Sequence, residues 1–164
     1  MTTMTAMTNS TATTARLTQP AVALPDVMAA LQAFGAAIAA TGLAPRTVGL
    51  VNMRASQING CAVCVEGGVR EARRDGETDD RLLLVATWRE TPIFTAAERA
   101  ALALCEAVTR LADRDDPVPD VVWAEAAAHY DERHLAGLVA QIANINLWNR
   151  LNVATRQQAG VHTW

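Results

Sequence analysis

Helical spacing of apolar residues is the dominant pattern in this chain, and proline and glycine mark the ends of its first helical blocks. Pro25 and Pro45 are each followed by apolar residues three or four positions apart, and Gly42 and Gly60 close the two blocks. About a fifth of the residues are Ala and only 4% are aromatic, which favours helices over strands. The sequence therefore predicts an all-α fold, with no strand pattern and no internal repeat.

The same spacing predicts a domain of about six to seven helices. Thr95 and Glu98 have the sequence of a capping box, which indicates the start of the strongest helix. Asp75-Gly76 and Pro92 are expected to end two further helices. The expected helices cover about residues 25–40, 45–59, 61–74, 78–91, 95–111, 119–129 and 131–155.

A length of 164 residues and an apolar content of 51% suit one domain with a substantial core. Residues 1–19 are Thr-rich and have little to bury, so we expect a mobile leader there. Residues 20–156 are expected to form the helical domain, and residues 157–164 a polar tail.

Charge and hydropathy exclude several classes of partner. The 14 basic residues are all Arg and face 17 acidic residues, which gives a formal net charge of −3 and no basic stripe for nucleic acid. Pro25 and Asp26 interrupt the apolar stretch 21–40, so we expect a soluble helix rather than a membrane span. With no signal-peptide pattern and an odd count of three Cys, the expected location is the cytoplasm.

Cys61 and Cys64 form a Cys-x-x-Cys motif directly after Gly60, where the helix at 61–74 is expected to begin. Unpaired amides and the helix dipole at such a position favour the thiolate over the thiol. A thiolate that attacks a peroxide becomes a sulfenic acid, which the second thiol converts to a disulfide. An external dithiol then restores the pair, and this cycle requires no metal or organic cofactor.

Two other uses of the motif stay open at this point. Half of a zinc site would need two further ligands, and only Cys105, His129, His134 and His162 are on offer, with no second close-spaced pair. The motif could also have no chemical role. Cys105 lies in an apolar helical row and is interpreted as a small core residue, and the histidines at 129 and 134 as surface or cap residues.

Several segments together resemble the AhpD-like branch of the carboxymuconolactone decarboxylase superfamily, in order from residue 20 to residue 156. They are RASQINGCAVC at 54–64, GET at 76–78, RL at 81–82, WRETP at 88–92, the 95–104 helix with ERAAL at 98–102, and INLWNRLN at 145–152. The resemblance implies an all-helical fold, a homo-oligomer (dimer, trimer or hexamer) and a peroxidase or disulfide reductase activity. It also implies that Cys64 attacks the peroxide and Cys61 resolves the product, whereas the helix-end electrostatics do not choose between the two thiols.

The chain departs from the family pattern at two positions. The pattern has a Glu twelve residues before the first Cys and a His four residues after the second, where this chain has Gly49 and Gly68. In the family these side chains relay the proton from the attacking thiol, and such assistance contributes roughly 10²–10⁴ in rate. We therefore expect a slow peroxidase. Either the glycines open a pocket for a bulkier ligand, or the chain has kept the fold and lost efficient catalysis.

The leading prediction is a thiol-dependent peroxidase or disulfide oxidoreductase that uses Cys61 and Cys64. The alternatives are a non-catalytic oligomeric binding or redox-sensing protein and, from the superfamily name alone, a lactone decarboxylase. Trp88 and Trp148 are interpreted as core or subunit contacts rather than ligand contacts. The asparagines at 144, 146 and 149 are expected to make buried polar contacts between helices or subunits.

Overall fold

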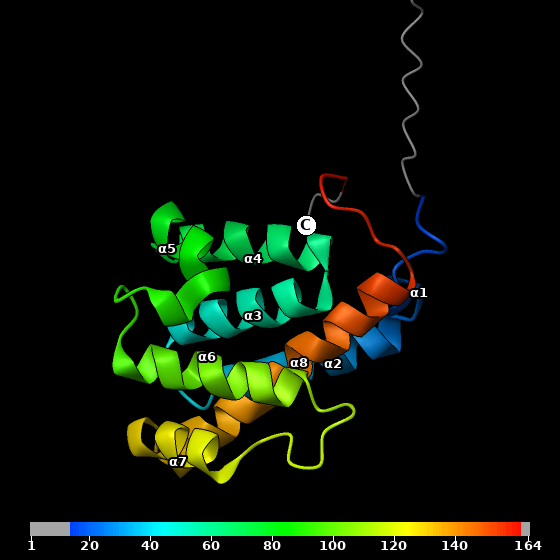
Figure 1. The fold of residues 1–164 in the computed structure, drawn as a ribbon. Helices are drawn as coiled ribbons and strands as arrows, with labels where there is room; N and C mark the ends of the chain where they lie inside the picture. Colours follow the sequence, from blue (N-terminus) through cyan, green and yellow to red (C-terminus); the bar gives the residue numbers. More distant parts are fainter. Residues whose placement is uncertain (1–13, 162–164) are drawn as a thin grey trace, which may run out of the picture.

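The computed structural model describes residues 14–161, and within them every regular element is a helix (Figure 1). This confirms the all-α prediction. The elements are α1 (Pro20–Ala23), α2 (Pro25–Ala39), α3 (Pro45–Asn59), α4 (Ala62–Arg74), α5 (Asp79–Leu84), the 3₁₀ helix η1 (Val85–Glu90), α6 (Ala96–Thr109), α7 (Asp120–His129) and α8 (Glu132–Ala154).

Two short elements were not expected from the sequence. α1 is a single turn that Gln19 caps through its side chain, and it stops before Pro25 begins α2. The predicted helix at 78–91 is divided after Leu84, where Val85–Glu90 form the 3₁₀ helix η1, and Thr87 inside η1 has non-helical backbone angles (φ −118°, ψ 26°). The predicted capping box at Thr95 and Glu98 is confirmed.

α3 is the central helix and packs against α4, α6 and α8. Figure 1 shows α3 between α4 and α6, with α8 crossing close to it. One core cluster lies between α3, α6 and α8 and includes Val51, Leu104 and Ile142. A second lies on the α4 side and includes Met53 and Trp88, which confirms the interpretation of Trp88 as a core residue.

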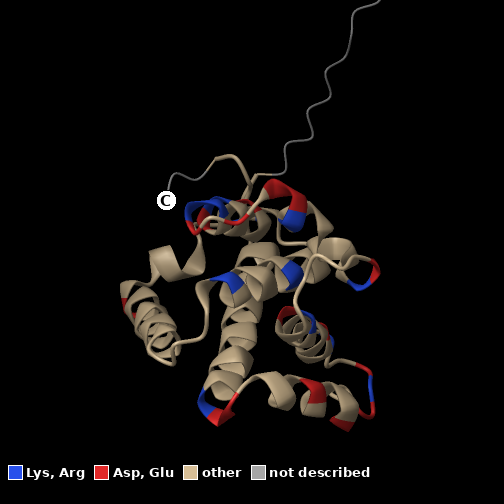
Figure 2. Ribbon diagram, turned by 90° about the vertical axis from the view of Figure 1, so that its left-hand side faces the viewer, with Lys and Arg blue, Asp and Glu red and all other residues tan. Residues whose placement is uncertain are grey.

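A buried ion cluster joins α3 to α6 and η1. The Glu106 carboxylate accepts hydrogen bonds from Arg54 Nε (2.7 Å), Trp88 Nε1 (3.0 Å) and Arg89 Nη1 (2.7 Å). Burial raises the pKa of Glu106, but these hydrogen bonds outweigh burial and hold the pKa at about 2. Elsewhere acidic residues and Arg are interspersed over the molecule rather than separated into regions of one sign (Figure 2).

α2 is an apolar helix that the rest of the domain leaves mostly uncovered. Ile38 is its one buried residue, whereas Val27 is 38% and Phe34 is 40% exposed. The turn that follows α2 meets α8 closely at Thr41, whose Oγ1 would lie 2.5 Å from a Cβ on Gly137. None of the helices within residues 14–161 combines the length and apolar character that a membrane crossing requires.

The two ends of the described chain lie together beside the end of α8. Arg16 N donates to Thr155 O (2.9 Å), and Gln157 Nε2 donates to Leu17 O (3.0 Å). These hydrogen bonds attach residues 16 and 17 to the segment at the end of α8. Residues 1–13 of the expected leader and residues 162–164 of the expected tail, including His162, lie outside the described residues.

Candidate functional site

Cys61 and Cys64 form a disulfide at the start of α4, with their Cα atoms 5.3 Å apart. Gly60 ends α3 in the left-handed conformation (φ 66°), and Cys61 is the N-cap residue of α4. The predicted position of the motif at a helix N-terminus is thus confirmed. Cys61 is only 2% exposed, whereas Cys64 is partly exposed, so Cys64 is the more accessible residue of the pair.

A hollow of about 350 Å³, which we name the Cys64 hollow, opens beside the second cysteine. Its volume lies within the range of small-molecule sites. Gly67 and Gly68 of α4 border it, and Ile145 and Trp148 of α8 contribute apolar surface. Trp148, which the sequence placed among core or subunit contacts, therefore lies at the candidate site. The remaining lining residues are Gln19, Val22, Met28, Asn52, Val63, Arg70, Glu71, Arg74 and Asn152.

A second hollow, of about 520 Å³, lies on the side of Cys61. It is bordered by Gly60 and Cys61 and by the polar segment after α8, including Arg156 and Gln157. Asn152 borders both hollows. The disulfide is thus flanked by one hollow at Cys64 and by a second near Cys61.

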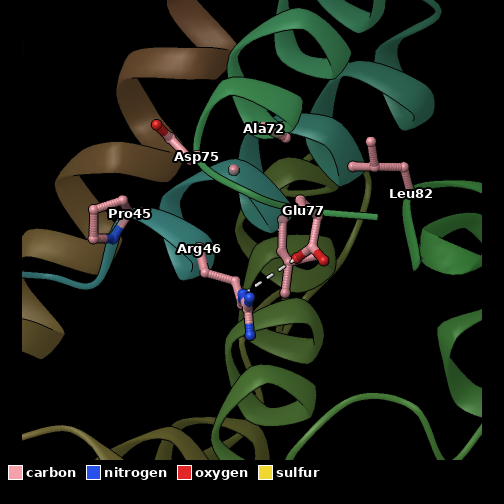
Figure 3. A pocket seen from close by; sticks show the side chains of 8 residues that line it. Pro45, Arg46, Ala72, Asp75, Glu77 and Leu82 are labelled. Atoms are coloured by element: carbon pink, nitrogen blue, oxygen red, sulfur yellow. Dashed lines mark ion pairs between the residues drawn. The ribbon is translucent and has the colours of Figure 1, made fainter. Parts of the chain in front are cut away.

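The two glycines at the family's relay positions do not border the same space. Gly68 borders the Cys64 hollow, but Gly49 lines a narrow hollow with Ala72 and the ion pair of Arg46 and Glu77 (3.5 Å; Figure 3). The open space beside the sulfur therefore involves Gly68 and not Gly49. A Cβ on Gly49 or Gly68 would lie 3.8 Å from its nearest neighbour, which is ordinary contact.

Asn152, near the end of α8, hydrogen-bonds directly to the sulfur of Cys64. Its Nδ2 donates to Cys64 Sγ at 3.3 Å, and Gln19 Nε2 donates to its Oδ1 at 3.3 Å. Neither Asn152 nor Gln19 was predicted at the site from the sequence. The spacing of Asn149 and Asn152 on one helix was the available signal, because positions three apart share a helix face.

A second group of asparagines fixes the end of α3, just before the motif. Asn59 Nδ2 donates to Asn146 Oδ1 (2.9 Å) and to Asn149 Oδ1 (2.8 Å), and Asn149 Nδ2 donates to Ser56 Oγ (3.0 Å). The expected polar contacts between helices are thus confirmed for Asn146 and Asn149. Asn144 is also buried, but its Oδ1 has no hydrogen-bond partner among the described residues.

Glu66 and Cys105 each interact with groups outside the Cys61–Cys64 pair. Glu66 Oε1 pairs with Arg70 (3.2 Å), and its Oε2 accepts from Gly160 N (2.7 Å). Burial raises the pKa of the Cys105 thiol to about 12, and its Sγ donates to Val51 O at 3.3 Å. Cys105 is therefore a core residue, as predicted.

The zinc alternative has no support within residues 14–161. His129 pairs with Glu125 (3.8 Å) and His134 with Asp131 (2.8 Å), so both occupy the surface or cap positions expected for them. No group of three or more His, Cys, Asp or Glu in this part of the chain could hold a metal ion.

Comparisons with known sequences agree with this architecture. Residues 25–107 match the model of the carboxymuconolactone decarboxylase family. The uncharacterised protein YdfG of Bacillus subtilis (strain 168) is 37% identical over 110 residues, which cover 67% of this chain and 74% of YdfG. The uncharacterised protein YnjA of Escherichia coli (strain K12) is 37% identical over 113 residues, which cover 68% of this chain and 60% of YnjA.

Solved structures extend the similarity to the whole fold. A protein of unknown function from Agrobacterium tumefaciens, provisionally assigned to antioxidant defence as AhpD, is 36% identical with a TM-score of 0.83, over 91% of this chain and 100% of that one. The apo debrominase Bmp8 is 25% identical with a TM-score of 0.72, over 84% of this chain and 73% of its own. Together with the paired cysteines at the start of α4, these matches show that the chain belongs to the AhpD-like branch of the carboxymuconolactone decarboxylase family.

Proposed function

We propose that this protein is a thiol-dependent peroxidase or disulfide oxidoreductase whose Cys61 and Cys64 alternate between dithiol and disulfide. The observation that carries the proposal is the bonded pair itself, with the partly exposed Cys64 beside a hollow of about 350 Å³. Membership in a family that includes redox proteins and a debrominase supports an enzymatic role. No metal or organic cofactor enters the proposed cycle.

The greater exposure of Cys64 supports its role as the attacking thiol. Its thiolate attacks one oxygen of the peroxide and breaks the O–O bond, and the other oxygen leaves as an alkoxide or hydroxide that takes up a proton. Cys64 is then a sulfenic acid. The Cys61 thiol attacks this sulfur, so that the disulfide forms and water leaves. An external dithiol returns two electrons by thiol–disulfide exchange, and it leaves as its own disulfide.

The missing Glu and His side chains support a low turnover rate. Neither Gly49 nor Gly68 can accept the proton of Cys64, and Glu66 is held by Arg70 and by the chain near Gly160. The proton must then pass to solvent or to the substrate. The proposal thus combines a competent thiol pair with weak general-base assistance.

A peroxide-consumption assay with a dithiol reductant tests the proposal. Cys61→Ser and Cys64→Ser should each lose the reductant-dependent turnover, and Cys105→Ser should keep it because Cys105 is buried away from the pair. Equal rates in the wild type and in all three variants would remove the proposal.

The absence of both relay side chains favours a second candidate, a redox sensor in which the disulfide locks the site without turnover. A sensor should form the Cys61–Cys64 disulfide once with peroxide and return to the dithiol only slowly. Multiple turnovers with excess dithiol would exclude it, and one peroxide consumed per chain would favour it.

We further propose that a second copy of this chain covers the apolar face of α2 in a homo-oligomer, and that the protein works in the cytoplasm. The exposure of Val27 and Phe34 supports the first point. The need to regenerate the dithiol supports the second, because the cytoplasm keeps thiols reduced.

A further inference from the structure

Hydrogen bonds from Val22 through Gln19 determine whether the nitrogen or the oxygen of the Asn152 side-chain amide faces Cys64. The backbone N–H of Val22 donates to Gln19 Oε1 at 3.0 Å. Because a backbone N–H can only donate, the oxygen of Gln19 faces Val22 and its Nε2 faces Asn152. That Nε2 donates to Asn152 Oδ1, so Asn152 presents its Nδ2 to Cys64 Sγ at 3.3 Å. The backbone of α1 therefore orients the Asn152 side chain, through Gln19, so that its Nδ2 donates to the sulfur of Cys64.

This hydrogen-bonded chain is shielded from water. Gln19 is 5% exposed and Asn152 is 6% exposed. The segment before α1 is held by the hydrogen bonds of Arg16 and Leu17 to the end of α8. In such surroundings water competes little, and a hydrogen bond to a charged group is stronger than in bulk solvent.

We propose that Asn152 stabilises the Cys64 thiolate of the reduced protein, and that Gln19 is the positioning residue that holds the Asn152 amide in the donating orientation. An N–H donor favours a thiolate over a thiol, because the anion is the better acceptor. Asn152 supplies charge stabilisation but no base, since a carboxamide does not take up protons at neutral pH. The inference rests on the redox role proposed above for Cys64.

The test uses the Cys61→Ser protein, in which Cys64 is the single accessible thiol. The chain has three cysteines, and the pKa of buried Cys105 is about 12. The rate of alkylation by iodoacetamide is followed against pH, together with the ultraviolet absorbance of the thiolate. Adding Asn152→Ala should move the midpoint of the pH dependence to higher pH. It should lower the alkylation rate at pH 6 about tenfold and change the maximal rate at high pH little. A loss of packing alone would not shift the midpoint in this way.

Gln19→Glu provides a variant of the same shape. Its carboxylate still accepts from Val22 N but cannot donate to Asn152 Oδ1, so the Asn152 amide should turn and present its oxygen to the sulfur. The midpoint should again rise. The matched control is Asn52→Asp, which places the same charge at the Cys64 hollow and keeps the oxygen that accepts from Gln141 Nε2, but lies outside the Gln19–Asn152 contact; it should move the midpoint less.

The double variant Gln19→Glu with Asn152→Ala distinguishes an effect that Gln19 exerts through Asn152 from a direct electrostatic effect of the new carboxylate on the Cys64 thiol. If Gln19 acts through Asn152, Gln19→Glu should add little once Asn152 is already Ala. Full additivity would overturn the role of Gln19, and an unchanged midpoint in Asn152→Ala would overturn the proposal. If Asn152→Ala does not fold, an unchanged midpoint in folded Gln19→Glu would overturn the proposal instead. Because alkylation needs no peroxide, failure of peroxide turnover leaves this result intact and is judged separately.

Discussion

Asn152 Nδ2 lies 3.3 Å from Cys64 Sγ, although the two residues are 88 positions apart in the sequence. The contact joins the end of α8 to the first turn of α4, where the thiol pair sits. Three features of this chain therefore meet on one sulfur: the start of a helix, a side-chain amide donor, and a hollow bordered by Gly67 and Gly68. The expected outcomes below follow from this arrangement and from the packing that supports it.

Restoring the family's relay should increase peroxidase activity. In the double variant Gly49→Glu with Gly68→His, each new Cβ lies 3.8 Å from its nearest neighbour, so neither backbone position excludes a side chain. We expect at least a tenfold gain in kcat/KM for a small peroxide, since general-base assistance contributes roughly 10²–10⁴. Thermal unfolding checks the fold, and no gain in a folded double variant would favour a remodelled site.

Glu106 should make the protein sensitive to acid. Its folded-state pKa of about 2 lies below the ordinary value of 4.5, so the ionised carboxylate stabilises the fold fully above about pH 4.5 and loses this effect as the pH falls toward 2. Glu106→Gln should lower the free energy of unfolding at pH 7 by about 3 kcal/mol, because Arg54 loses its charged partner. Urea unfolding at pH 7 and pH 3 should show the two proteins converging at the lower pH; parallel pH profiles would contradict this account.

The close contact of α8 with the turn after α2 should not tolerate a methyl group. Gly137→Ala places a Cβ 2.5 Å from Thr41 Oγ1 and should destabilise the fold by about 1–3 kcal/mol. The matched control, Gly35→Ala in α2, meets nothing within 4 Å and should stabilise the helix by about 0.5–1 kcal/mol. Chemical denaturation measures both changes, and equal effects would show that the close contact is not the cause.

The uncovered face of α2 should be a subunit contact. Phe34→Asp and Val27→Asp should shift the protein toward smaller species in sedimentation velocity, because a charge at a buried apolar interface is costly. Val121→Asp on α7, where Val121 is 74% exposed, is the control and should leave the assembly unchanged. A wild type that sediments as a monomer at high micromolar concentration would refute the proposed oligomer.

The helices could be predicted closely because their boundaries depend on local chemistry. Pro25, Pro45, Gly60 and the Thr95 capping box act within a few residues, and the long helices end within about two residues of the predicted positions. α1 and the change to a 3₁₀ helix after Leu84 were missed because a single capped turn and a short tightened stretch of helix leave no periodic signal.

The site was only partly predictable for a related reason. Cys61 and Cys64 lie three residues apart in the sequence, so the spacing predicted that one sulfur can reach the other, while a zinc site stayed open as an alternative. Asn152, Gln19 and Trp148 reach the site through tertiary packing, which no local pattern describes. From the sequence, Gly49 and Gly68 were interpreted together as the two positions of one lost proton relay, whereas the packing of α3 on α4 places them at different hollows.

The most direct measurement is intact mass and thiol content after reduced protein meets one equivalent of a hydroperoxide. We expect the wild type to lose two thiols and two hydrogen atoms and to yield a peptide linked through Cys61 and Cys64. Cys61→Ser should instead carry a sulfenic acid on Cys64 that a 1,3-diketone probe traps. Recovery of both thiols unmodified, in folded protein with the peroxide unconsumed, would contradict the account.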